Sequence, residues 1–81
     1  MNTFETVVGI LEELAPGVDL ETCETLIDDR YIDSLAMLAL VADLEDAFEI
    51  EIPAVEIVAS NFNSARTLAQ MIDRIKEEDL G

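Results

Sequence analysis

The sequence contains no histidine and only four positively charged residues against 19 acidic ones, so its formal net charge is −15. Histidine is the most common general base, and its absence argues against an enzyme that activates its own nucleophile. Each phosphate contact of a nucleic-acid-binding protein needs a cation, which excludes nucleic acid as a partner and disfavours anionic membrane surfaces. The charge instead favours partner proteins with basic surfaces, found through electrostatic steering.

Paired cysteines, a cationic leader and long apolar runs are also lacking. The single cysteine cannot form an internal disulfide, and there is no Cys–His cluster to bind zinc. The first ten residues lack the cationic region of a signal peptide, and no apolar run approaches the roughly 20 residues of a membrane span. Hydrophobic residues make up 51% of the chain, enough for a core. We therefore expect one cytoplasmic, monomeric domain over residues 1–81, with no catalytic residue, no metal site and no direct membrane insertion.

Helical periodicity dominates the start of the chain. Residues 3–15 are predicted to form an amphipathic helix that Thr3 caps and Pro16-Gly17 ends. Residues 16–33 form a long connection, which a short turn is expected to fix to the core. The residues expected to face inward are Phe4, Val7, Val8, Leu11 and Leu14 in the helix, and Leu20, Cys23, Leu26 and Ile27 in the connection.

The strongest helix prediction covers residues 34–48, a run of helix formers without Gly, Pro or Thr. Asp33 is the predicted N-cap, because its carboxylate suits the positive end of the helix dipole. Two adjoining stripes are expected to face the core, one of Leu35, Leu38, Val41 and Leu44 and one of Leu40, Leu44 and Phe48. Residues 49–53 are predicted to be extended, since alternation replaces the helical period and Ile52 precedes a proline.

The remaining residues predict one short helix and one long one. The short helix is expected over 54–60, a break over 61–64, and the long helix over 64–78. The residues expected inside are Val55, Val58 and Ala59 in the short helix, Phe62 in the break, and Leu68, Met71, Ile72 and Ile75 in the last helix. The predicted fold class is all-α, a four-helix bundle of three longer helices plus a short third helix.

Ser34 is the clearest candidate in the sequence for a residue with a chemical role. It follows Asp33 and a long loop and opens the strongest helix, so its hydroxyl is expected to be exposed beside N–H groups that can bind a phosphate. With no neighbouring base it cannot act as a self-activated nucleophile. The residues alone leave two interpretations, an ordinary capping serine or a site where another enzyme attaches a phosphate-linked group.

Three segments together resemble the acyl carrier protein family: Asp33-Ser34-Leu35, the helix end Leu44-Glu45-Asp46-Ala47-Phe48, and the following Glu49-Ile50-Glu51-Ile52-Pro53. The resemblance covers nearly the whole chain. It implies that Ser34 receives 4′-phosphopantetheine, whose thiol carries acyl or aminoacyl groups as thioesters. The implied partners are a phosphopantetheinyl transferase, an acyl- or aminoacyl-loading ligase, and acyltransferases or synthases with basic docking patches.

The resemblance also implies roles for residues near Ser34. The supporting and partner-facing residues are Asp33, Leu35, Ala36, Met37, Ala39, Glu45 and Asp46. If acyl chains are sequestered, the bundle must open a cavity, whose expected walls are Leu44, Phe48, Val58 and Phe62.

Two departures from the family pattern bear on function. Carriers usually have a glycine shortly before the Asp-Ser pair, whereas residues 30–32 are Arg-Tyr-Ile here, so a rare cation lies near the attachment point. Fatty-acid carriers place acids on the partner-facing stripe that Ala36, Ala39 and Ala42 occupy in this chain. That face, with segments 27–34 and 61–64, resembles free-standing D-alanyl-type carriers, which are the first alternative. The second alternative is an acidic adaptor without a prosthetic group.

Overall fold

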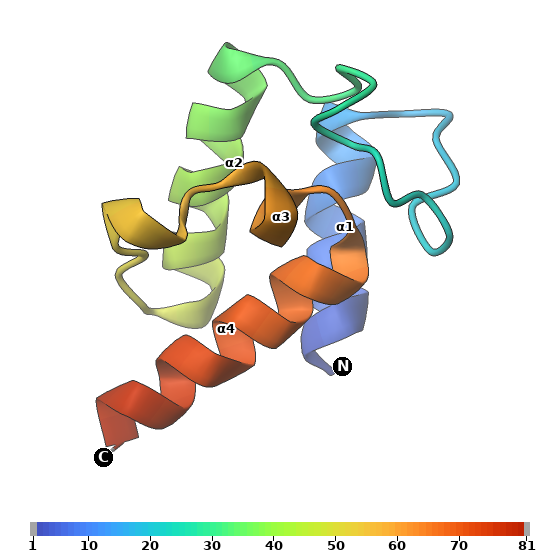
Figure 1. Ribbon diagram of the computed structural model, residues 1–81. Helices are drawn as coiled ribbons and strands as arrows, with labels where there is room; N and C mark the ends of the chain where they lie inside the picture. Colours follow the sequence, from blue (N-terminus) through green and yellow to red (C-terminus); the bar gives the residue numbers. More distant parts are fainter. Residues whose placement is uncertain (1, 81) are drawn as a thin grey trace.

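The computed structural model describes residues 2–80 and contains no β-strand in that range. Its elements are α1 (Thr3–Leu14), α2 (Ser34–Phe48), a 3-10 helix η1 (Ala54–Glu56), α3 (Ala59–Phe62) and α4 (Ala65–Leu80). α1 packs against α2 and α4, and α3 packs against α4. In Figure 1, α4 runs obliquely across α1, and the long connection loops out beyond the end of α1. The expected all-α bundle of three longer helices and one short one is confirmed.

One hydrophobic core joins all four α-helices, the α1–α2 connection and the segment after α2. Its fully buried side chains are Val7, Leu11, Leu26, Leu40, Leu44, Phe62, Leu68, Met71 and Ile72. The stripe expected on the last helix is therefore confirmed, and so is the burial of Phe62. No helix among the described residues is both long enough and apolar enough to cross a bilayer.

The start of α1 differs from the prediction. Asn2, not Thr3, is the N-cap, because its side-chain oxygen accepts a hydrogen bond of 2.8 Å from the backbone N–H of Glu5. The Thr3 hydroxyl instead donates to Asp73 Oδ1 at 2.8 Å and ties α1 to α4. Both residue types cap helices well, so local sequence alone did not decide between them.

The connection between α1 and α2 contains turns but no helix, and it is fixed to the core as expected. Leu20 and Leu26 are buried, and Cys23 and Ile27 are half-buried. Much of this fixing comes from Asn63, at the junction of α3 and α4. The Asn63 side-chain oxygen accepts hydrogen bonds from the N–H groups of Ile27 (2.9 Å) and Asp28 (3.1 Å). Its amide group donates to Asp28 Oδ2 at 3.2 Å.

Replacing Asn63 with alanine should therefore destabilise the fold. Two backbone N–H groups and one carboxylate lose their partner together, which we expect to cost about 2 kcal/mol in the free energy of unfolding. Urea denaturation followed by circular dichroism measures this loss. The matched control is Asn61→Ala on α3, whose side chain bonds only Glu56 and leaves the connection untouched. Amide exchange at Ile27 and Asp28 should accelerate in Asn63→Ala and not in the control.

The orientation of α2 corrects one of the two predicted stripes. Leu40 and Leu44 are buried and Phe48 is half-buried, as the second stripe predicted. Leu35 and Leu38, however, are 78% and 70% exposed, so their half of the first stripe faces away from the core. The chain places apolar side chains on both faces of α2, and periodicity alone could not tell which face the other helices cover.

The segment after α2 was expected to be extended over residues 49–53, and residues 50–53 are indeed outside any helix, but Glu49 is in the left-handed region (φ +54°) and ends α2. The helix expected over 54–60 is wrong. One turn of 3-10 helix covers Ala54–Glu56, and α3 begins only at Ala59. Val55 and Val58 are 82% and 43% exposed, and Ala59 is exposed as well. Ile57 lies against the core in their place. The break is also shorter than expected, because Asn61 and Phe62 belong to α3.

Candidate functional site

Ser34 is the first residue of α2, and its side chain is exposed. Asp33 is the N-cap, as predicted: its Oδ1 accepts a 2.8 Å hydrogen bond from the N–H of Ala36, and its carbonyl oxygen accepts one of 2.8 Å from the N–H of Met37. The Ser34 hydroxyl has no hydrogen-bond partner among the described residues. The first N–H groups of a helix have no partner within it and carry the positive end of its dipole. This end of α2 therefore presents a free hydroxyl in surroundings that favour an attached phosphate.

An open apolar pocket of about 390 Å³ begins at Ser34 and follows α2, and we call it the attachment groove. Its lining is Ser34, Met37, Leu38, Val41, Ala42 and Glu45 from α2, with Ile57 from the segment after η1. Most of this lining is apolar, so the groove suits hydrocarbon groups.

A second pocket of about 380 Å³ also has Ser34 at its edge, and we call it the loop pocket. Its lining is Ile27, Arg30, Ile32, Asp33, Ser34 and Met37. It joins the end of the α1–α2 connection to the first turn of α2. Ser34 and Met37 thus belong to both pockets.

The predicted partner-facing residues lie along α2, with different exposures. Leu35, Ala39 and Asp46 are exposed, whereas Ala36 and Met37 are half-buried and pack against the core. Glu45 is also half-buried, and its Oε2 accepts a 2.9 Å hydrogen bond from the N–H of Ile52. Part of the Glu45 carboxylate therefore fixes the connector after α2.

The four residues expected to line an acyl cavity lie at different depths in the structure. Leu44 and Phe62 are fully buried in the core, Phe48 is half-buried, and Val58 is on the surface.

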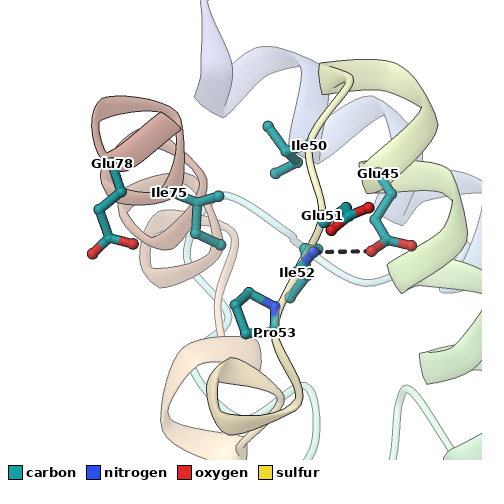
Figure 2. A pocket seen from close by; sticks show the side chains of 7 residues that line it. All are labelled: Glu45, Ile50, Glu51, Ile52, Pro53, Ile75 and Glu78. Atoms are coloured by element: carbon teal, nitrogen blue, oxygen red, sulfur yellow. Dashed lines mark hydrogen bonds between the residues drawn. The ribbon is translucent and has the colours of Figure 1, made fainter. Parts of the chain in front are cut away.

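A third pocket, of about 610 Å³, lies between the C-terminal halves of α2 and α4. Figure 2 shows it with Ile75 and Glu78 on one side and Glu45 on the other. Its lining is Glu45, Ile50, Glu51, Ile52, Pro53, Ile75 and Glu78. Three carboxylates make it a poor site for a hydrocarbon chain.

Sequence reasoning missed the residues that form the attachment groove beyond Met37. Leu38 and Val41 were assigned to the core, Ala42 was assigned to the partner-facing stripe of small residues, and Ile57 was not considered. Helical spacing held the missing signal, because positions 34, 37, 38, 41, 42 and 45 share one face of an α-helix. A search for apolar residues at three- and four-residue steps from Ser34 finds this face.

Residues 4–75 match the model of a protein family described as the phosphopantetheine attachment site. The chain belongs to this family. Its members are non-catalytic carriers that hold 4′-phosphopantetheine covalently. The expected carrier function, cofactor and non-enzymatic character are therefore confirmed, and the adaptor without a prosthetic group is set aside. A carrier of this kind implies partner enzymes such as transferases and ligases.

Relatives of this carrier include D-alanyl carrier proteins and acyl carrier proteins. It is 30% identical over 77 residues to a D-alanyl carrier protein of Streptococcus equi subsp. zooepidemicus, covering 94% of this chain and 98% of the relative. It is 32% identical over 79 residues to an acyl carrier protein of Streptococcus pneumoniae, covering 96% and 97%. An acyl carrier protein of Streptococcus pyogenes is 40% identical over 57 residues, covering 69% of this chain and 77% of the relative.

Proposed function

We propose that this protein is an acyl carrier and that Ser34 is its attachment residue. The observation that carries the proposal is the free, exposed Ser34 hydroxyl at the N-terminus of α2, with the attachment groove beginning beside it. The residues fit the group, because the helix end suits its phosphate and the apolar groove suits a thioester-bound hydrocarbon chain. When bound, 4′-phosphopantetheine supplies a thiol that carries acyl groups as thioesters.

The attachment step needs only the hydroxyl from this chain. The Ser34 Oγ attacks the phosphorus of coenzyme A that bears the pantetheine, forming a phosphodiester to the serine. The bond from that phosphorus to adenosine 3′,5′-bisphosphate breaks, and the hydroxyl proton passes to a base of the transferase. Asp33 is a positioning residue, since its bond to Ala36 N–H fixes the first turn of α2 and thereby the Ser34 side chain.

The cargo in this proposal is an acyl chain, supported by the apolar lining of the attachment groove. Leu38, Val41, Ala42 and Ile57 offer hydrocarbon contacts and no charge, whereas Glu45 bounds the groove at the end far from Ser34. The alternative cargo is an amino acid delivered by an adenylating ligase, as in a D-alanyl-type carrier. It is favoured by the exposed small residues Ala39 and Ala42 on the face of α2.

We further propose that the exposed side of α2 is the docking face for partner enzymes. Leu35 and Leu38 are the large apolar side chains there, and apolar residues this exposed on a folded domain contribute little to stability. The acids Asp43 and Asp46 are exposed farther along α2. The proposed partners therefore combine an apolar contact with a basic rim. The proposal places the protein in the cytoplasm, in keeping with a sequence that offers no internal disulfide.

Replacing both Leu35 and Leu38 with alanine should separate docking from folding. The thermal midpoint should change little, since both side chains are mostly exposed. The kcat/KM of the transferase or loading ligase should fall by about tenfold or more, because a few residues at the centre of an interface carry most of its binding energy. The control is Gln70→Ala, at an exposed position of α4. Equal kcat/KM values for the double variant and wild type would remove this face from the docking surface.

The proposal is tested by intact-protein mass spectrometry after incubation with coenzyme A, Mg²⁺ and a broad-specificity phosphopantetheinyl transferase. We expect a gain in mass of one phosphopantetheine, and peptide mapping should place it on Ser34. The modified protein is then offered to acyl-loading and aminoacyl-loading ligases. A thioester with fatty acid supports the acyl carrier, and one with D-alanine alone supports the alternative. No gain in mass with any transferase would overturn Ser34 as the attachment residue.

A further inference from the structure

We propose that Arg30 binds the phosphate of the group attached at Ser34 and so holds the base of the arm against the loop pocket. This inference rests on the proposed function, because it needs Ser34 as the attachment residue. It concerns a residue at which the chain departs from the carrier pattern, and four independent features of Arg30 lead to it: its backbone, its free charge, its position and the charges around it.

The backbone of Arg30 adopts an unusual conformation for an arginine. Its φ is +61°, in the left-handed region that glycine enters freely and other residues enter at a cost. Glu49 also has a positive φ, but it ends α2 in the way that many helices end. Arg30 lies in a loop, where its N–H donates to the Ile27 carbonyl at 3.0 Å. The turn thus keeps the geometry of a glycine turn and yet carries a long cationic side chain.

The guanidinium of Arg30 has no carboxylate partner among the described residues, although the chain holds 19 acids. The other three cations each have a partner: Arg66 binds Glu24 at 2.6 Å, Arg74 binds Glu56, and Lys76 lies 5.6 Å from the centre of the Phe48 ring.

The acids nearest to Arg30 in sequence are engaged elsewhere. Asp28 accepts from the Asn63 amide at 3.2 Å, and Asp29 accepts from the Thr25 hydroxyl at 2.6 Å. Asp33 accepts from the N–H of Ala36. The hydrogen bonds that shape this loop therefore hold its carboxylates and leave the cation available.

The position of Arg30 relative to Ser34 is the third feature. Arg30 and Ser34 line the same loop pocket, so a phosphate bonded to the Ser34 Oγ has access to a space that Arg30 also lines. A guanidinium presents two parallel N–H groups, which match the two non-bridging oxygens of a phosphodiester.

The charges around Ser34 give the contact between Arg30 and the phosphate an electrostatic role. A phosphodiester adds one negative charge to a chain whose net charge is already −15, and it does so beside Asp33, with Asp28 and Asp29 close by in the chain. The N-terminus of α2 attracts the phosphate, and these three carboxylates repel it. Arg30 is the cation placed to offset that repulsion.

The test compares wild type with Arg30→Gln, Arg30→Lys and the control Lys76→Gln. The control removes the same charge at the other end of α2, roughly 20 Å from Ser34 along a 15-residue helix. Each protein is prepared with and without the attached group, and intact mass verifies the state. Arg30→Gln changes the charge and leaves the loop conformation equally strained in both states, so strain cancels in the comparison.

Two readouts are independent of any loading reaction. The ³¹P resonance of the phosphodiester should shift in Arg30→Gln relative to wild type, less in Arg30→Lys, and not in Lys76→Gln. The change in thermal midpoint on modification should be more favourable in wild type than in Arg30→Gln by a few degrees at low salt. That difference should shrink as NaCl is added, since an exposed contact is screened over about 10 Å at 0.1 M.

The outcomes separate this inference from the proposed function. If wild type gains no phosphopantetheine, both fail. If every variant is modified but Arg30→Gln matches Lys76→Gln in its ³¹P shift and thermal difference, the role of Arg30 alone is overturned, and Ser34 stands as the attachment residue.

Discussion

Replacing Ser34 with alanine should abolish the gain in mass from phosphopantetheine completely and leave the fold unchanged. Alanine has no oxygen to form the phosphodiester, so the loss is absolute and not a matter of affinity. The exposed hydroxyl makes no hydrogen bond among the described residues, and the free energy of unfolding should therefore change by less than about 0.5 kcal/mol. Intact-protein mass spectrometry and urea denaturation of the same sample measure the two effects together.

The chain offers a matched control for this substitution in Ser64, the residue that precedes α4. Ser64 is buried, and its Oγ accepts a 3.1 Å hydrogen bond from the N–H of Thr67. Ser64→Ala should lose about 1 kcal/mol of stability through the missing cap and keep its full gain in mass. Ser34→Ala should show the reverse. A gain in mass that persists in Ser34→Ala would place the attachment elsewhere.

Replacing Phe62 with alanine should have the largest effect on stability. Phe62 is fully buried and is the only buried residue of α3, so it fastens that four-residue helix to the core. Removing its ring leaves a cavity and should cost about 3–5 kcal/mol. A domain of this length has roughly 4–12 kcal/mol in total, so the variant should be partly unfolded near body temperature. The measurement is the denaturation midpoint followed by circular dichroism.

Phe62→Leu is the conservative comparison, because it retains most of the apolar volume and should cost about 1–1.5 kcal/mol. A loss below about 1 kcal/mol in Phe62→Ala would mean that α3 is held by other contacts. The attachment groove provides a second readout, since its Ile57 wall lies just before α3. A loosened α3 should increase the solvent exposure of Ile57.

The helices of this protein were largely predictable from sequence, and the reason differs from one segment to the next. The bounds of α2 were exact because Asp33 marks its start and the extended run before Pro53 marks the region beyond its end. The segment from 54 to 58 was misjudged because the apolar residues Val55 and Val58 fit a helical pattern but are exposed in the fold. Tertiary packing, not spacing, decides which apolar residues of a short segment are buried.

The functional site, too, was predictable from the sequence only in part. Asp33 was correctly predicted as the cap from its position alone, since capping is local chemistry. Leu35 was predicted both as a core residue and as a partner-facing residue, and its exposure decides against the core. The attachment groove depends on Ile57, 23 positions after Ser34, and the sequence contains no local signal for that proximity.

Asn63 has a consequence for how this protein ages. Its side chain must accept from two N–H groups and donate to Asp28 at once, so only an amide satisfies all three bonds. Asparagine side chains hydrolyse slowly to aspartate. That single-atom change would preserve the two accepted bonds and bring two carboxylates face to face where an amide and a carboxylate now meet at 3.2 Å. In a chain with 19 acids, one neutral amide holds the connection that leads to Ser34, and the chemical lifetime of that amide limits the lifetime of the loop conformation.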